Sequence, residues 1–206
     1  MIAVIDTSSR MLSCLLAEQD GTVHAVSQRL ARGQAALADL LGLLAGIERS
    51  LDDVTTVAAC TGPGSFTGIR VGLATAYGMQ RAAAGSRRDL VVVGFTQLAA
   101  RAWQLEPGTS AEVSCDAQRR ERYRQQWMRP ADGGPPVPLD AISTIPRPAG
   151  HPEDPPLDPA WLASAAIAAA AAGPAGEGAM LPVATYVRAP DATPSRPAAP
   201  APRGTA

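Results

Sequence analysis

The sequence predicts an α/β protein in which three consecutive strands precede alternating helices and strands. Short apolar runs separated by polar turns predict the strands, and longer amphipathic or small-residue stretches between them predict the helices. The predicted strands of the first part of the chain cover residues 2–5, 12–17, 22–30, 56–60 and 90–93. The first three strands are joined so tightly that we expect them to be antiparallel.

Three helices are predicted in the same part of the chain, at residues 34–47, 68–84 and 96–105. Leu37 and Leu41 belong to the apolar side of the first of them. The helix at residues 68–84 follows a buried strand and a glycine-rich loop, residues 61–68, so that the local unit is strand, loop and helix.

The glycine-rich loop is a candidate for anion binding, because backbone N–H groups at a helix N-terminus attract phosphates. A P-loop would need a lysine after the last glycine, and all 18 basic residues of this chain are arginine. Ser65 and Thr67 are the candidate caps of the following helix. An anion contact through Gly64 and Ser65 therefore stays an alternative to a structural turn or a protein contact.

The helix after this loop carries two rows of small residues at a spacing of four. Interior glycines cost about 1 kcal/mol each relative to alanine, so a close packing partner is expected to offset them. That partner is either the protein's own sheet or a helix of another protein. One row is Gly68, Gly72 and Ala76, and the second is Ala74, Gly78 and Ala82.

Composition narrows the class of protein. The chain has 206 residues, 46% of them hydrophobic, with a formal net charge of -1, which argues against a protein held to nucleic acid mainly by its overall charge. Cys14, Cys60 and Cys115 lie far apart in apolar runs and are expected to be buried reduced thiols. No leader and no membrane anchor are predicted, since the longest apolar run, residues 165–172, is too short to span a bilayer.

After residue 105 we expect a smaller second lobe. It contains predicted strands at residues 111–115 and 121–128, an irregular proline-rich stretch over 130–159 and a helix at 160–172. In the second strand Tyr123 and Trp127 share one face, while Arg120, Arg122 and Arg124 share the other. This arginine row could contact RNA phosphates, but a solvated strand face is the favoured interpretation.

Residues 61–78, TGPGSFTGIRVGLATAYG, resemble the signature of the bacterial TsaB (YeaZ) family nearly letter for letter. Asp116-Ala117-Gln118 and Tyr186-Val187-Arg188 are similar to two further motifs of that family. The resemblance implies a degenerate actin-like ATPase fold (ASKHA, RNase H-like) with a smaller second lobe. The expected division is an N-terminal RNase H-like lobe at 1–105, a C-terminal lobe at 106–188 and a disordered tail at 189–206.

In the actin-like superfamily the aspartate of the first strand and the turn after it face the phosphates and metal of ATP. Asp6, Thr7 and Ser8 occupy that place in this chain. A nucleotide contact there is one interpretation, and an aspartate that caps its own turn is the other.

The resemblance also implies a function: a non-catalytic subunit of the complex that installs threonylcarbamoyl on adenosine 37 of tRNA. Its partners would be a TsaD-type transferase, in a heterodimer, and a TsaE-type ATPase, with tRNA reached indirectly through the complex. No cofactor is expected on this chain, because ATP is handled by the partner subunits. A homodimer without the transferase stays open, and the location is expected to be cytoplasmic, without a membrane.

The partner interface implied by the resemblance consists of both small-spaced helices. An arginine at Gly72 or Ala76 is therefore expected to leave a folded chain that no longer binds the transferase. The interface residues are Leu37, Leu41, Gly68, Gly72 and Ala76.

No complete active site is visible in the sequence. The two histidines, His24 and His151, do not form the His-x-x-x-His metal site that marks TsaD, and Ser65 does not lie in a G-x-S-x-G elbow. The alternative function is a small ATP-dependent phosphotransferase of the actin-like superfamily. ATP turnover by the pure chain would discriminate between the two.

Overall fold

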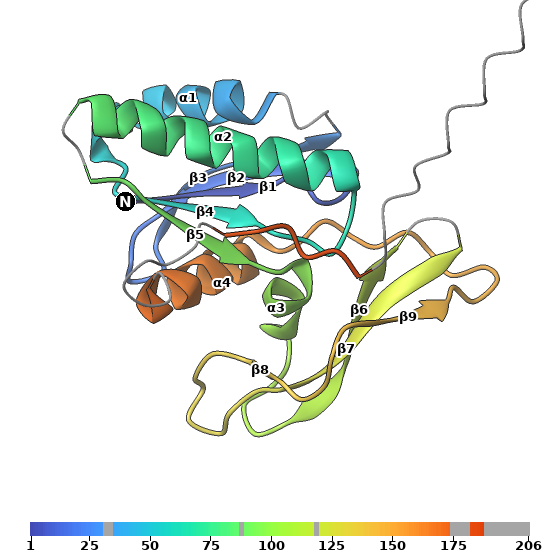
Figure 1. Cartoon of the computed structure of the whole chain (residues 1–206). Coiled ribbons are helices and arrows are strands. Elements are labelled where there is room, and N and C mark those ends of the chain that lie inside the picture. Colours follow the sequence, from blue (N-terminus) through green and yellow to red (C-terminus); the bar gives the residue numbers. More distant parts are fainter. Residues whose placement is uncertain (31–34, 87–88, 118–119, 174–181, 188–206) are drawn as a thin grey trace, which may run out of the picture.

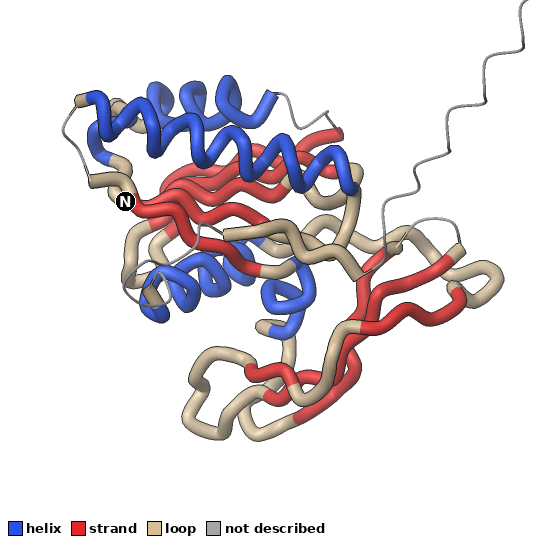
Figure 2. The backbone as a smooth tube through the Cα atoms, viewed as in Figure 1, coloured by secondary structure: helices blue, strands red, loops and turns tan. Residues whose placement is uncertain are grey.

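A computed structural model describes residues 1–30, 35–86, 89–117, 120–173 and 182–187. The tail predicted at 189–206 lies outside these residues. Two sheets make up the framework, and helices cover both faces of the first one (Figures 1 and 2).

The first sheet has five strands in the order β3-β2-β1-β4-β5. The three N-terminal strands pair in antiparallel fashion, as predicted, whereas β1 with β4 and β4 with β5 are parallel. Every residue of β1 and β4 is buried, which explains why both segments are apolar along their length rather than alternating. The strands are β1 (Ile2–Asp6), β2 (Met11–Ala17), β3 (Val23–Leu30), β4 (Thr56–Cys60) and β5 (Val91–Phe95).

Two helices, α1 (Ala36–Gly46) and α2 (Phe66–Gly85), lie side by side on one face of this sheet (Figure 1). The side chain of Ser65 accepts a hydrogen bond from the backbone N–H of Gly68, so the cap predicted at Ser65 or Thr67 is Ser65. Thr96 caps the short helix α3 (Gln97–Ala102) in the same way, through the N–H of Ala99. A single 3₁₀ turn (Leu51–Asp53) precedes β4.

The opposite face of the first sheet is covered by α4 (Pro159–Ala172), which follows the second sheet in the chain. Leu162 and Ala166 of α4 pack in one apolar cluster with Ile2 and Val4 of β1. The helix was expected within the second lobe, yet it returns to the first sheet. The expected division of the chain at residue 105 stays a prediction.

The second sheet is built around a long hairpin, β6 (Ser110–Asp116) and β7 (Glu121–Met128). Two short strands, β8 (Val137–Pro138) and β9 (Ser143–Pro146), pair with opposite ends of β7. The sequence indicated only irregular chain here, because prolines mask strand patterns, and both strands end on a proline. Tyr123 and Trp127 of β7, which were predicted to share one face of the strand, are buried in the same apolar cluster.

Candidate functional site

The turn after β1 holds the first group of predicted site residues. Asp6 is 2% exposed, and its Oδ1 atom accepts hydrogen bonds from the backbone N–H of Ser8 (2.8 Å) and from the Ser8 hydroxyl (2.6 Å). Burial raises the pKa of the Asp6 carboxyl, while the hydrogen bonds from Ser8 act in the opposite direction. This geometry is that of an aspartate capping its own turn, which was one of the two interpretations of Asp6.

The glycine-rich loop packs directly on the same turn. The N–H of Ser65 donates to the Ser8 carbonyl (2.6 Å), and the Thr7 hydroxyl donates to the Gly68 carbonyl (2.7 Å). A Cβ atom on Gly64 or Gly68 would overlap the backbone carbonyl of Ser8 or Thr7. The glycines therefore allow two backbones to approach each other closely. The turn after β1 and the glycine-rich loop, which were the two predicted phosphate contacts, therefore form hydrogen bonds with each other.

The row Gly68, Gly72 and Ala76 faces the interior of the protein. A Cβ atom on Gly72 would overlap the Thr7 hydroxyl, and Ala76 has no exposed surface. This row was expected to pack either on the protein's own sheet or on a helix of another protein. In the structure it packs on the protein's own sheet. The structure argues against the expectation that an arginine at Gly72 or Ala76 leaves the chain folded, because neither position has room for one.

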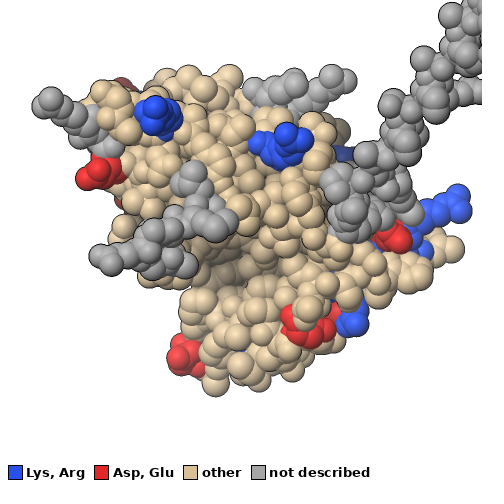
Figure 3. Space-filling view, viewed as in Figure 1, with Lys and Arg blue, Asp and Glu red and all other residues tan. Residues whose placement is uncertain are grey.

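The second row of α2, Ala74, Gly78 and Ala82, is exposed. Leu37 and Leu41 of the neighbouring α1 are exposed by 41% and 43%. The side of the molecule formed by α2 is mostly uncharged, with isolated basic side chains (Figure 3). Of the five predicted interface residues, Leu37 and Leu41 are therefore accessible to a partner, and their role at an interface stays a prediction.

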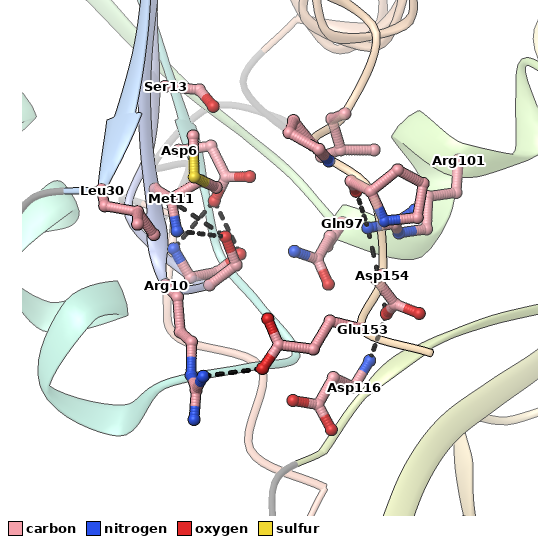
Figure 4. A pocket seen from close by; sticks show the side chains of 15 residues that line it. Asp6, Arg10, Met11, Ser13, Leu30, Gln97, Arg101, Asp116, Glu153 and Asp154 are labelled. Atoms are coloured by element: carbon pink, nitrogen blue, oxygen red, sulfur yellow. Dashed lines mark hydrogen bonds and ion pairs between the residues drawn. The ribbon is translucent and has the colours of Figure 1, made fainter. Parts of the chain in front are cut away.

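A cavity of about 310 Å³ lies where the two sheets meet (Figure 4). Its walls come from the β1–β2 turn, from α3 and from residues 153–157, which cross the cleft before α4. Arg10 and Glu153 form an exposed ion pair at its edge (2.8 Å). Figure 4 shows the Gln97 amide and the Asp6 carboxyl on opposite sides of this space. The cleft is the region in which the sequence placed a nucleotide contact at Asp6.

The predicted arginine row is not uniformly a solvated strand face, because Arg122 is buried and Arg120 is exposed. Arg122 is 5% exposed and forms an ion pair with Asp154 (2.7 Å), and its guanidinium also donates to the Ser114 hydroxyl. Arg124 pairs with Glu112 (3.3 Å), whereas Arg120 lies in the turn before β7 with a φ of 64°. The interpretation as a solvated face is therefore wrong for Arg122, whose charge is used inside the protein.

The remaining candidate groups are far apart. His24 lies on β3 beside Glu18, and His151 contacts the carbonyl of Pro152. Among the described residues no cluster of three or more His, Cys, Asp or Glu side chains could hold a metal ion. No helix within that part of the chain is long and apolar enough to cross a membrane.

The three cysteines are buried and free, as predicted. Burial raises the pKa of Cys14 and of Cys115 to about 12, and that of Cys60 well above its ordinary value. Thiols with such pKa values carry almost no thiolate at neutral pH, so none of the three is a nucleophile.

Part of the chain is similar to proteins of tRNA threonylcarbamoyladenosine biosynthesis. A family model described as "TsaD: tRNA N6-adenosine threonylcarbamoyltransferase" matches residues 36–125. The tRNA threonylcarbamoyladenosine biosynthesis protein TsaB of Escherichia coli (strain K12) is 32% identical over 137 residues, which are 64% of this chain and 57% of that protein. Over these regions the chain is similar to the TsaB (YeaZ) family. The match spans little more than half the length of the Escherichia coli relative.

Two solved structures share the fold of this chain. YeaZ from Pseudomonas aeruginosa superposes with a TM-score of 0.58 at 22% identity, over 70% of this chain and 67% of that one. An uncharacterized protein from Pseudomonas aeruginosa, described as similar to peptidase YEAZ, gives 0.70 at 21% identity, over 91% of this chain and 99% of that one. The predicted fold, an actin-like ATPase fold with an RNase H-like core, is confirmed.

Sequence reasoning missed the contacts that tie residues 153–157 to both sheets. Arg101 and Asp154 lie 53 positions apart and in no recognisable motif, so the sequence carried no signal that they meet. It also missed the contact between the rings of Phe66 and Tyr186, whose centroids are 5.1 Å apart. The segment Tyr186-Val187-Arg188 had been noted for its resemblance to a motif of the TsaB family, but the ring that contacts Tyr186 had not been identified.

Proposed function

We propose that this protein is a non-catalytic subunit of the tRNA N6-threonylcarbamoyladenosine (position 37) synthesis complex, and that it binds and activates a TsaD-type transferase. Similarity to TsaB supports the pathway, because the Escherichia coli relative is named for the biosynthesis of threonylcarbamoyladenosine. A TsaE-type ATPase would complete the assembly, and tRNA would be bound through the complex. Its location is proposed to be cytoplasmic.

The observation that carries the binding role is the apolar outer face of α1. A surface helix normally places charged or polar residues on its solvent side. The one charged residue of α1, Asp39, instead turns toward β3 and pairs with Arg29 (2.6 Å). What α1 presents to solvent is uncharged, and its exposed residues are Leu37, Ala38, Leu41, Gly42, Ala45 and Gly46.

The exposed row of α2 fits the same role. Ala74, Gly78 and Ala82 carry almost no side chain, and within 4 Å of a Cβ atom on Gly78 there is no other described atom. A helix of another protein can therefore approach the α2 backbone closely beside the leucines of α1. We place the transferase interface on these two exposed faces, rather than on the inner row of α2.

A matched pair of variants tests this interface. Leu41→Arg places a charge on the outer face of α1, and Leu139→Arg places one on a leucine that is 54% exposed beside the second sheet. Both chains should fold, because each of the two leucines has about half of its surface in solvent. Burying an unpaired arginine costs several kcal/mol, so Leu41→Arg should weaken transferase binding about a hundredfold or more, while Leu139→Arg should not.

Binding is measured by titration calorimetry against the TsaD-type transferase of the same organism, and activity by formation of threonylcarbamoyladenosine in the reconstituted system. Equal binding by the two variants would remove α1 from the interface. Failure of the wild-type chain to bind or stimulate the transferase would overturn the proposed function itself.

The alternative, a small ATP-dependent phosphotransferase, receives less support from the site. The Asp6 side chain caps its own turn, and residues 153–157 cross the cleft in which a nucleotide would lie. The isolated chain is expected not to hydrolyse ATP. Turnover that survives repurification and disappears in Asp6→Ala would favour the phosphotransferase.

A further inference from the structure

Two guanidinium groups from different parts of the fold converge on one carboxylate in the cleft. Arg122 of β7 contacts Oδ1 of Asp154 (2.7 Å), and Arg101 of α3 lies 4.0 Å from Oδ2. The backbone N–H of Asp116 also donates to Oδ2 (2.7 Å). Arg101 is 8% exposed and Arg122 is 5% exposed, so solvent does not screen these charges.

The segment that carries Asp154 is fastened to both sheets. On the side of the first sheet, the Gln28 amide donates to the Leu157 carbonyl (2.6 Å), and Arg101 donates to the Pro155 carbonyl (3.2 Å). On the side of the second sheet, Arg147 donates to the carbonyls of residues 151 and 152, both at 2.9 Å. Figure 4 shows Asp154 between Arg101 and Asp116, at the wall of the cavity. Residues 153–157 therefore form a strap across the cleft.

One carboxylate does not satisfy these two arginines. Within the described part of the chain, Nε of Arg101 and Nη1 of Arg122 are buried without a hydrogen-bond acceptor. Buried donors on charged groups are rarely left unpaired, because each has lost its water. An oxyanion with three or four oxygens offers more acceptors than a carboxylate and a higher negative charge. The adjoining cavity of about 310 Å³ gives such an ion space beside Arg101.

We propose that Arg101 and Arg122 form an anion-binding site whose resident occupant is the Asp154 carboxylate of the chain itself. Asp154 then fills the anion-binding site, and residues 153–157 cross the cleft and hold the two sheets together. When the carboxylate is removed, the site accepts a free oxyanion such as inorganic phosphate. This proposal concerns the cleft and does not depend on the function proposed for α1 and α2.

The test uses inorganic phosphate as the probe and two variants of adjacent acids. Asp154→Ala empties the proposed site, whereas Glu153→Ala removes the neighbouring carboxylate, whose ion pair among the described residues is with the exposed Arg10. Melting temperatures are measured in phosphate and in sodium chloride of equal ionic strength. Phosphate at one hundred times its Kd should raise the melting temperature of Asp154→Ala by about 5 °C and leave that of Glu153→Ala unchanged.

Titration calorimetry then gives the stoichiometry, which should be one phosphate per Asp154→Ala chain and none per Glu153→Ala chain. Adding Arg122→Gln to Asp154→Ala should abolish the phosphate effect. Equal responses of Asp154→Ala and Glu153→Ala, or equal responses to phosphate and chloride, would overturn the proposal. If Asp154→Ala is unfolded in chloride, phosphate should restore its native circular dichroism, and failure to do so in both Asp154→Ala and Asp154→Asn would also overturn it.

Discussion

Helix α2 carries two rows of small residues that look alike in sequence and lie in opposite environments. Gly68, Gly72 and Ala76 contact the turn after β1 or lie buried against the first sheet, whereas Ala74 and Gly78 face solvent. The inner row lets α2 approach its own protein, and the outer row leaves the backbone accessible to another protein. Small residues at a spacing of four therefore predict that the helix backbone packs closely on a partner, but they do not identify that partner.

The largest effect is expected from a long charge on the inner row. Gly72→Arg would place its side chain against Thr7 in the core, where the charge has no partner, and the penalty of several kcal/mol approaches the whole stability of a domain. The variant should be insoluble or lack native circular dichroism. Gly78→Arg, on the outer row, should fold normally. A folded Gly72→Arg chain would show that α2 can move away from β1.

A smaller change on the inner row should still be costly. In Gly68→Ala the new methyl group would overlap the Thr7 carbonyl, and backbone cannot yield as a flexible side chain can. We expect a loss of about 3 kcal/mol in the free energy of unfolding, measured by urea denaturation. A loss of less than about 0.5 kcal/mol in the free energy of unfolding, as for an ordinary surface substitution, would mean that the glycine-rich loop does not pack tightly on the turn.

A glycine-to-alanine substitution on the outer row should increase the free energy of unfolding rather than decrease it. Gly78 lies within the helix and a Cβ atom there meets no described atom within 4 Å, so alanine gains helix propensity without a clash. Gly78→Ala should raise the free energy of unfolding by about 1 kcal/mol in the same urea titration. A decrease would indicate that the outer row already packs on part of the chain.

The smallest structural change tests the turn on which the inner row packs. Because burial raises the pKa of Asp6, the folded state keeps this proton to higher pH than the unfolded chain does, and stability falls as pH rises above about 4 through the folded pKa. Asp6→Asn cannot titrate, so it should gain stability relative to wild type as pH rises. Urea titrations at pH 5 and pH 8 measure this, and parallel pH profiles of the two proteins would contradict it.

Much of the first sheet could be predicted from the sequence, because its local signals are strong. Buried strands read as short apolar runs, the pair Asp20-Gly21 marks a hairpin, and Ser65 stands where a helix cap is needed. Where the local signal was weak, prediction failed. The strands β8 and β9 contain prolines, and they exist because β7 offers them backbone partners.

The sequence by itself determined the order of the elements of the first sheet, the resemblance to the TsaB (YeaZ) family and the presence of two small-residue rows on one helix. The tertiary structure alone decided which row is buried, because helical periodicity fixes the angle between two rows and not their orientation to the sheet. It also decided that Arg122 is an internal charge, since the carboxylate that pairs with it comes from residue 154, far along the chain. Contacts between distant residues depend on how the chain returns across the cleft. Local sequence patterns do not predict that path.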